Sequence, residues 1–224
     1  LERELRMPGG HEPAGRRATL HAALSQALGW AGLLHEALQA NTAALAEIGE
    51  IEPFDEQFLG YRVEHWAVGL RGRILVRMAR FPEARECLGR MLSLEKRALD
   101  PTVRLIAHVG SLEMASALED TAAALEHAQQ ATAIAAEHPN AYLRVFALAA
   151  QGLAATVRGD FSAAIAAYGE SLALLRASRA AMEYQSELLA SLAECHLRTG
   201  HREAAVEAAT QALAVARSQT TRLP

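Results

Sequence analysis

Three arginines stand at a spacing that suits binding of carboxylates. Arg73, Arg77 and Arg80 are four and three residues apart, so on one helix they would share a face. A guanidinium group pairs well with a carboxylate through two parallel hydrogen bonds. Two interpretations stay open: a solvated basic face, or a strip that docks the carboxylates of a peptide or of a neighbouring domain.

The two tryptophans pose a similar choice between core and contact residue. Trp66 precedes the arginines on the same expected helix, and Trp30 stands near the end of the first expected helix. Most tryptophans in helices of this kind pack in a core, yet tryptophan and arginine also dominate binding energy at interfaces. We keep both interpretations for each residue.

The sequence contains none of the common motifs of catalytic or metal sites that we considered. The nine histidines include no HExxH pair, and the sequence has no phosphate loop, no GxGxxG and no GxSxG. Glu194–His196 reads "ECH", but adjacent residues of a helix point in different directions. We therefore predict no catalytic residue, no cofactor and no metal, and no enzymatic activity of this segment.

Composition limits the partners and the setting. The formal charge is −4 and 51% of the residues are apolar, which disfavours a nucleic-acid binder and a disordered chain. No run of eighteen apolar residues and no signal peptide occurs, and Cys87 and Cys195 lack a paired spacing. We expect no membrane contact, a cytoplasmic location with reduced cysteines and, since the chain begins at Leu1, a piece of a longer protein.

The elements that would position these residues recur along the chain. A turn residue appears at intervals of 47, 40, 40 and 41 residues, and an alanine follows each one after five residues. Such a period predicts stacked helical hairpins. The turn residues are Gly32, Ala79, Glu119, Gly159 and Gly200, and the alanines are Ala37, Ala84, Ala124, Ala164 and Ala205.

Each hairpin is expected to have a helix, a tight turn and a second helix. The turn residue ends the first helix with a positive φ, and the alanine lets the second helix approach the first closely. In the fourth hairpin Ile165, Tyr168, Leu172 and Leu175 form one apolar stripe at helical spacing. A further small residue lies seven positions before four of the turns, at Ser25, Gly72, Gly152 and Ala193.

The helix boundaries follow from caps and breakers. Asp100, Asp120, Asn140 and Asp160 are candidate N-caps, and Pro101 suits a first helical position. We expect a lead-in at 1–15, a repeat domain at 16–218, a tail at 219–224, and a long loop or a longer helix at "IEPFDEQF". The ten expected helices span 16–30, 33–48, 57–78, 81–98, 101–118, 121–137, 140–158, 161–177, 180–199 and 202–218.

The pattern resembles the tetratricopeptide repeat, and Gly152, Gly159, Ala164 and Tyr168 match that motif. The resemblance implies an all-α superhelix, or solenoid, of about five hairpins and ten helices, whose first helices line a concave groove. The match departs from the family at Leu112, where a small residue is usual, and in a period longer than about 34 residues. The implied groove for a protein or peptide partner comprises Trp66, Arg73, Arg77, Glu113, Ser116, Phe146, Leu153, Glu194 and Arg198.

The C-terminal third contains "YLRVFALAAQGLA", "LAECHLRTGHREAA" and "ALAVARSQTTRLP". It resembles the repeat region of bacterial multidomain proteins with a class III adenylate/guanylate cyclase domain and an AAA-type ATPase module, and of LuxR-type ATP-dependent regulators. The resemblance implies a regulatory, protein-binding domain of a larger signalling protein. The alternative is a stand-alone scaffold that homodimerises through its terminal helices. The last helix is apolar for a cap, which leaves open whether neighbouring parts of a longer protein or a dimer partner would cover it. Its apolar residues are Ala205, Val206, Ala209, Leu213 and Val215.

Overall fold

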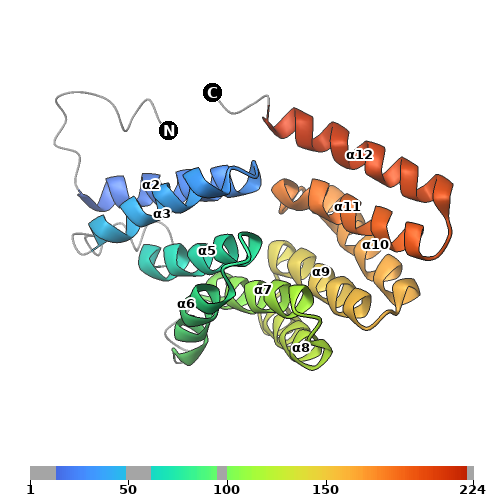
Figure 1. Cartoon of the computed structure of the whole chain (residues 1–224), viewed down its shortest axis with the longest axis horizontal. Helices are drawn as coiled ribbons and strands as arrows, with labels where there is room; N and C mark the ends of the chain where they lie inside the picture. The colour runs from blue at the N-terminus through green and yellow to red at the C-terminus, as the bar shows by residue number, and fades with distance from the viewer. Residues whose placement is uncertain (1–13, 49–61, 95–99, 221–224) are drawn as a thin grey trace. The chain divides into compact units, whose positions relative to one another are not determined.

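The computed structural model describes residues 14–48, 62–94 and 100–220, and in these ranges the chain is all-α, as predicted (Figure 1). The described residues form ten α-helices and one 3-10 helix, and no strand. None of these helices is both long and apolar enough to cross a bilayer. The elements are α2 (Ala14–Trp30), α3 (Leu34–Glu47), α5 (Val63–Arg77), α6 (Phe81–Ser93), α7 (Pro101–Ala117), α8 (Thr121–Glu137), α9 (Ala141–Val157), α10 (Phe161–Ser178), η2 (Met182–Tyr184), α11 (Gln185–Arg198) and α12 (Arg202–Thr220).

Contacts between residues divide the chain into two compact units, with the division after Gly110, inside α7. In the first unit α2 packs against α3, α5 against α6, and both α2 and α3 against α5. In the second unit α9 packs against α8 and α10, and α11 against α10 and α12. Within each unit, helices that are consecutive along the chain therefore pack side by side.

All five predicted turns share one hydrogen-bonded geometry. The turn residue donates its N–H to the carbonyl three residues earlier in the chain. The residue before it donates to the carbonyl four residues earlier, and the residue after it donates to the carbonyl five residues earlier. These N···O distances lie between 2.9 and 3.2 Å. The pattern is that of a Schellman-type helix end, which needs a left-handed residue. The φ angles confirm it: 78° at Gly32, 57° at Ala79, 57° at Glu119, 80° at Gly159 and 81° at Gly200.

The alanine five residues after each turn lies where the second helix begins. Its N–H donates to the carbonyl four residues back, at 2.9 to 3.0 Å, as one of the first bonds of the new helix. Four of these alanines are 0% exposed and the last, Ala205, is 7% exposed. A methyl group therefore fills this position in every hairpin, as the spacing predicted.

We expect Glu119→Gly to stabilise the protein by up to about 1 kcal/mol. Glu119 has a φ of 57°, and an L-residue in this conformation costs roughly 1–2 kcal/mol. Glycine removes that strain, although the unfolded chain gains entropy that offsets part of it. Urea titration of Glu119→Gly and of Glu119→Ala checks this, because alanine removes the same charge and keeps the strain. Equal stability of the two variants would contradict it.

The predicted caps are confirmed. Thr102 N–H donates to the Asp100 carboxylate at 2.7 Å, and Tyr142 N–H donates to the Asn140 side chain at 2.7 Å. Asp120 and Asp160 cap α8 and α10 in the same way, and Pro101 is the first residue of α7. The hydrogen bond from the Ala163 N–H lowers the pKa of the Asp160 carboxyl below its usual value, and the hydrogen bond from Arg158 lowers it further.

Three helix ends differ from the prediction by more than two residues. α5 begins at Val63, since Arg62 is extended, and α6 ends at Ser93, since Leu94 is extended. The remaining parts of these two expected helices, 57–61 and 95–98, lie outside the described residues. The α-helix expected from 180 begins at Gln185, after the 3-10 helix η2. Arg179 and Ala181 are left-handed, at φ 55° and 56°, without a glycine or proline to signal a break. A smaller difference lies at α2, which begins at Ala14 and so includes part of the expected lead-in.

Three further predicted segments lie wholly or partly outside the described residues. They are the first thirteen residues of the lead-in, the stretch "IEPFDEQF" and the last four residues of the tail. α12 extends to Thr220, two residues into the expected tail.

The apolar stripe of the fourth hairpin packs against the preceding helix. Tyr168, Leu172 and Leu175 are buried, and Ile165 is half-buried. The Tyr168 ring lies on Gly152 of α9, where a Cβ atom would come 2.6 Å from the ring. The small residue seven positions before this turn therefore makes room for an aromatic nine positions after it.

Burial of Tyr168 predicts loss of stability in alkali. Desolvation raises the pKa of its phenol to about 12, above the ordinary value of 10, and outweighs the opposing effect of the nearby Thr156 and Ser191 side chains. The folded protein therefore holds this proton between pH 10 and 12 where the unfolded chain releases it, which costs on the order of 2 kcal/mol by pH 12. Denaturation of wild type and Tyr168→Phe at pH 9 and pH 11.5 checks this. Stability should fall less in Tyr168→Phe, and an equal fall would contradict the account.

Candidate functional site

The first unit brings two of the predicted arginines onto one tryptophan. Trp30 is the last residue of α2 and is half-buried, and Arg73 and Arg77 lie one turn apart on α5. The guanidinium carbons of both arginines lie 5.6 Å from the centroid of the Trp30 ring. Each such contact contributes about 0.5–1 kcal/mol at an exposed site and about 2 kcal/mol when desolvated. We call Trp30, Arg73 and Arg77 the arginine–tryptophan cluster.

The two arginines of this cluster differ in exposure. Arg73 is 6% exposed, whereas Arg77 is an exposed residue. A Cβ atom on Gly110 would come 2.9 Å from Cγ of Arg73, so the aliphatic part of Arg73 lies directly on that glycine. Arg73 is thus fixed by packing, and Arg77 is the member that a partner in solvent can reach.

Arg80 does not belong to the cluster, although its spacing suggested a shared face. α5 ends at Arg77, and Arg80 lies beyond the left-handed Ala79 as the N-cap of α6. Its guanidinium group donates two hydrogen bonds to the Glu83 carboxylate, which raises the pKa of Arg80 and lowers the pKa of Glu83. The turn therefore redirects Arg80 to a partner within its own hairpin.

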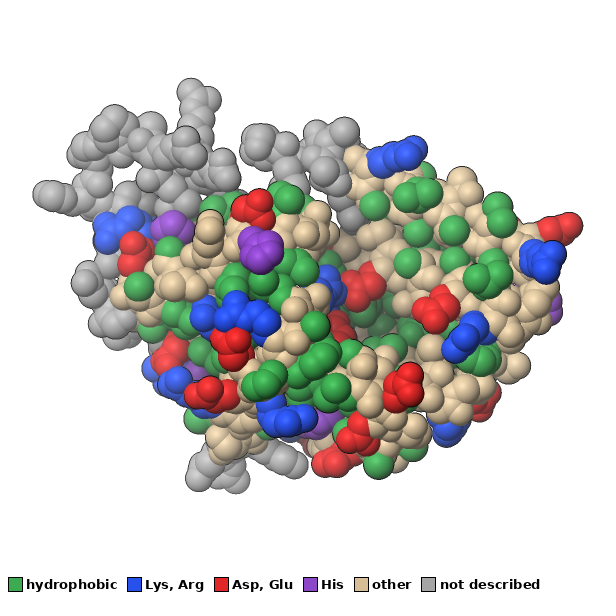
Figure 2. Space-filling view, viewed as in Figure 1, with side chains coloured by type: hydrophobic (Ala, Val, Ile, Leu, Met, Phe, Trp, Pro, Cys, Tyr) green, Lys and Arg blue, Asp and Glu red, His purple; other side chains and the backbone are tan. Residues whose placement is uncertain are grey.

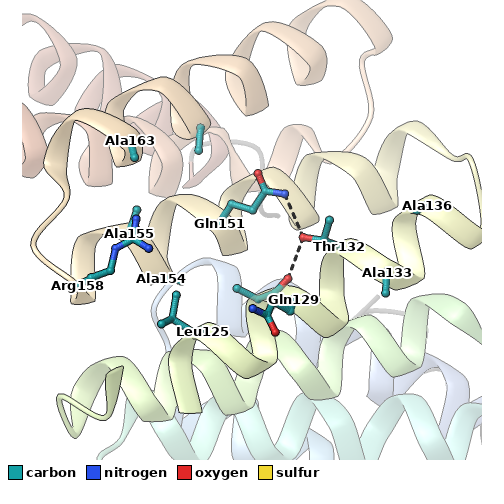
Figure 3. A pocket seen from close by; sticks show the side chains of 12 residues that line it. Leu125, Gln129, Thr132, Ala133, Ala136, Gln151, Ala154, Ala155, Arg158 and Ala163 are labelled. Atoms are coloured by element: carbon teal, nitrogen blue, oxygen red, sulfur yellow. Dashed lines mark hydrogen bonds between the residues drawn. The ribbon is translucent and has the colours of Figure 1, made fainter. Parts of the chain in front are cut away.

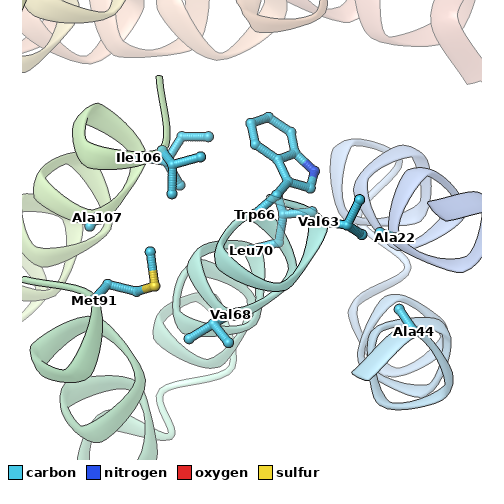
Figure 4. Close-up of a cluster of buried hydrophobic side chains, with 10 residues drawn as sticks. Ala22, Ala44, Val63, Trp66, Val68, Leu70, Met91, Ile106 and Ala107 are labelled. Atoms are coloured by element: carbon cyan, nitrogen blue, oxygen red, sulfur yellow. The ribbon is translucent and has the colours of Figure 1, made fainter. Parts of the chain in front are cut away.

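Trp66 belongs to the core of the first unit. It is 7% exposed and, in Figure 4, projects from α5 between Ile106 of α7 and Ala22 of α2. Of the two interpretations of Trp66, the structure favours the core residue. For Trp30 both interpretations stay open, because it is half-buried and carries two cationic side chains on its ring.

The second unit holds the other predicted groove residues. Phe146 is 2% exposed and stacks on Tyr184 at 4.7 Å between ring centroids, so its ring presents little surface to a partner. Leu153 of α9 is half-buried, as are Glu113 and Ser116 of α7. The groove as a whole draws residues from both units and stays a prediction.

Glu194 and Arg198 are exposed on α11. Arg198 lies over the Phe161 ring, with its guanidinium carbon 5.4 Å from the ring centroid. This pairing of an arginine with an aromatic ring resembles the arginine–tryptophan cluster in type, but only one cation is present on the ring.

A pocket that the sequence did not suggest opens between α8, α9 and α10 (Figure 3). Its volume is about 570 Å³, and alanines of all three helices form much of its lining. Gln151 crosses to α8 and donates to the Thr132 hydroxyl at 3.0 Å, and Thr132 donates to the Ala128 carbonyl at 2.9 Å. Gln151 and Thr132 thus bond to one another, and apart from Gln129 and Arg158 the rest of the lining is apolar. Alanines on three helix faces leave space there, a feature that no single motif signals.

The cysteines and the "ECH" stretch show no activated thiol. Cys87 and Cys195 are free thiols, and burial raises the pKa of both. Cys195 is 0% exposed, whereas its neighbour Glu194 is exposed, so the two side chains point in different directions. Among the described residues, no three His, Cys, Asp or Glu side chains come together in a group that could hold a metal ion.

Similarity to known proteins does not decide what the chain does. Neither a scan against models of protein families nor a search of curated proteins finds a match. The function therefore has to be inferred from the residues themselves, and the arginine–tryptophan cluster is the part of the described chain that best combines charge, aromatic surface and access.

Proposed function

We propose that this chain is a tetratricopeptide-like interaction domain that binds acidic segments of a protein partner at the arginine–tryptophan cluster. The observation that carries the proposal is the placement of two guanidinium groups on one indole ring, each at 5.6 Å. Arginine and tryptophan are the residue types that contribute most binding energy per residue at interfaces.

The cluster suits a carboxylate for three physical reasons. Guanidinium groups donate paired hydrogen bonds that match the two oxygens of a carboxylate. Arg73 is buried and already held by packing, so it adds positive charge beside Arg77 without losing conformational entropy when a partner docks. The Trp30 ring excludes water from one side of the cations and offers apolar surface beside the charge.

The wider role that we propose is regulatory. The C-terminal resemblance supports a cytoplasmic domain of a larger bacterial signalling protein, such as a class III cyclase or a LuxR-type regulator, with catalysis outside this segment. A partner at the cluster would change output only if it bound two arrangements of the whole protein with different affinity. The alternative role is a stand-alone scaffold, in which the same cluster would recruit the acidic partner.

Selection from a library of displayed random peptides tests the binding specificity. The immobilised full chain should enrich peptides in which Asp or Glu stands beside an aromatic or aliphatic residue. Enrichment should weaken when the selection is repeated at high salt, because partly exposed ion pairs are screened. Enriched peptides without acidic residues, or with unchanged binding at high salt, would contradict the proposal.

A further inference from the structure

The last hairpin carries the most exposed large hydrophobic residues of the described chain. Leu197 of α11 is 62% exposed, and Val206 and Leu213 of α12 are 66% and 57% exposed. The other large hydrophobic residues that are exposed in the described ranges reach only 36% to 45%. Val206 and Leu213 are seven residues apart, so they lie on one face of α12.

The preceding hairpin shows what this face is built to contact. A shift of 41 residues relates Thr156 to Leu197 and Leu172 to Leu213. Thr156 contacts the sulfur of Cys195 at 3.5 Å, and α10 packs against α11, so α11 covers this face of the fourth hairpin. Leu172 is accordingly 4% exposed, whereas Leu213 in the corresponding place is 57% exposed. The face of the last hairpin is therefore a helix-packing surface that no described element covers.

The charges of α12 indicate which helix fits this surface. Glu203 is in the first turn and Arg217 in the last, and in the space-filling view hydrophobic side chains lie along α12 with charged ones toward its ends (Figure 2). Glu203 and Arg217 each lie seven residues from Thr210. A second α12 that runs antiparallel about Thr210 would place Glu203 of each copy opposite Arg217 of the other.

The same arrangement matches the apolar residues. An antiparallel pair centred at Thr210 brings Val206 of one copy beside Leu213 of the other, twice by symmetry. Small residues between them, such as Ala209, allow the helix axes to approach closely. A parallel arrangement would instead place like charges together at both ends.

We propose that a second copy of this chain covers the α11–α12 face, with the two α12 helices packed antiparallel about a twofold axis near Thr210. The interface is isologous, since the same surface of each copy contributes to it. It lies apart from the arginine–tryptophan cluster in sequence, and it requires no binding of an acidic partner.

Light scattering after gel filtration of the full chain tests the dimer. Wild type should have twice the chain mass of 24.1 kDa, and Leu213→Glu should weaken dimerisation at least about tenfold. Leu118→Glu is the matched control, because Leu118 is an exposed leucine at the C-terminal end of α7, and it should leave the mass unchanged. A monomeric wild type, or a Leu213→Glu variant that dimerises like wild type, would overturn the proposal.

Charge exchange tests the antiparallel arrangement. Glu203→Arg and Arg217→Glu should each weaken the homodimer, because each creates two like-charge pairs. An equimolar mixture of these two variants should dimerise as wild type does, since every pair across the interface is then opposite in charge. Circular dichroism of each variant checks that α12 remains helical. A mixture no stronger than the single variants would overturn the antiparallel packing.

Discussion

Gly152→Ala should lower the free energy of unfolding by roughly 1–3 kcal/mol, although alanine has a higher helix propensity than glycine. A Cβ atom at this position would lie 2.6, 2.7 and 2.9 Å from three ring carbons of Tyr168. The ring is rigid and 3% exposed, so the surrounding side chains leave it little room to move away. The steric cost therefore exceeds the gain of about 0.5–1 kcal/mol that alanine usually gives over glycine in a helix.

Gly169→Ala provides the matched control on α10. No atom lies within 4 Å of a Cβ built at Gly169, so only the helix propensity changes and the variant should be more stable than wild type. Urea denaturation of both variants gives the comparison. In addition, Tyr168→Leu should reduce the cost of Gly152→Ala, because it removes the ring that the new methyl group meets. Equal stability of Gly152→Ala and Gly169→Ala would show that the two helices do not approach as described.

Ala164→Leu is the second substitution with a large expected effect, again roughly 1–3 kcal/mol of destabilisation. Ala164 is 0% exposed, in the first turns of α10 and packed beside α9. Three additional carbon atoms have no space there, so the hairpin must open or the side chain must adopt a strained rotamer.

The control for Ala164→Leu is Ala166→Leu, since Ala166 is exposed on the same helix. Thermal denaturation of the two variants separates overpacking from a general effect of leucine. Ala164→Leu should melt below wild type, whereas Ala166→Leu should melt close to it. A melting temperature of Ala164→Leu at or above wild type would mean that the five repeat positions are misaligned.

The hairpins were predictable because their signals are local. A left-handed residue, a cap and an alanine at fixed distances act within one turn of helix, so Gly159, Asp160 and Ala164 could be read together from the sequence. The left-handed turn residue also occurs at Ala79 and Glu119, where the residue type does not favour a positive φ. The spacing, rather than the glycine, carried the prediction there.

The candidate site was predictable only in part, because burial depends on contacts between distant segments. The spacing of Arg73 and Arg77 placed them on one face of α5, but α5 is buried on most sides, so periodicity could not show which face meets Trp30. Burial of Phe146 against Tyr184 depends on the 3-10 helix η2, which begins after an unsignalled break at Ala181. Arg80 is separated from Arg73 and Arg77 by the turn at Ala79, which ends α5 before Arg80.

The affinity of one selected acidic peptide for three forms of the full chain tests the central claim most directly. Isothermal titration should give at least about tenfold weaker binding to Arg77→Glu than to wild type. Arg71→Glu is the control, because it makes the same charge change on α5 at a residue whose guanidinium bonds with Thr42, and it should bind nearly as wild type does. Equal affinities of all three forms, or equal losses in both variants, would contradict a binding site at the arginine–tryptophan cluster.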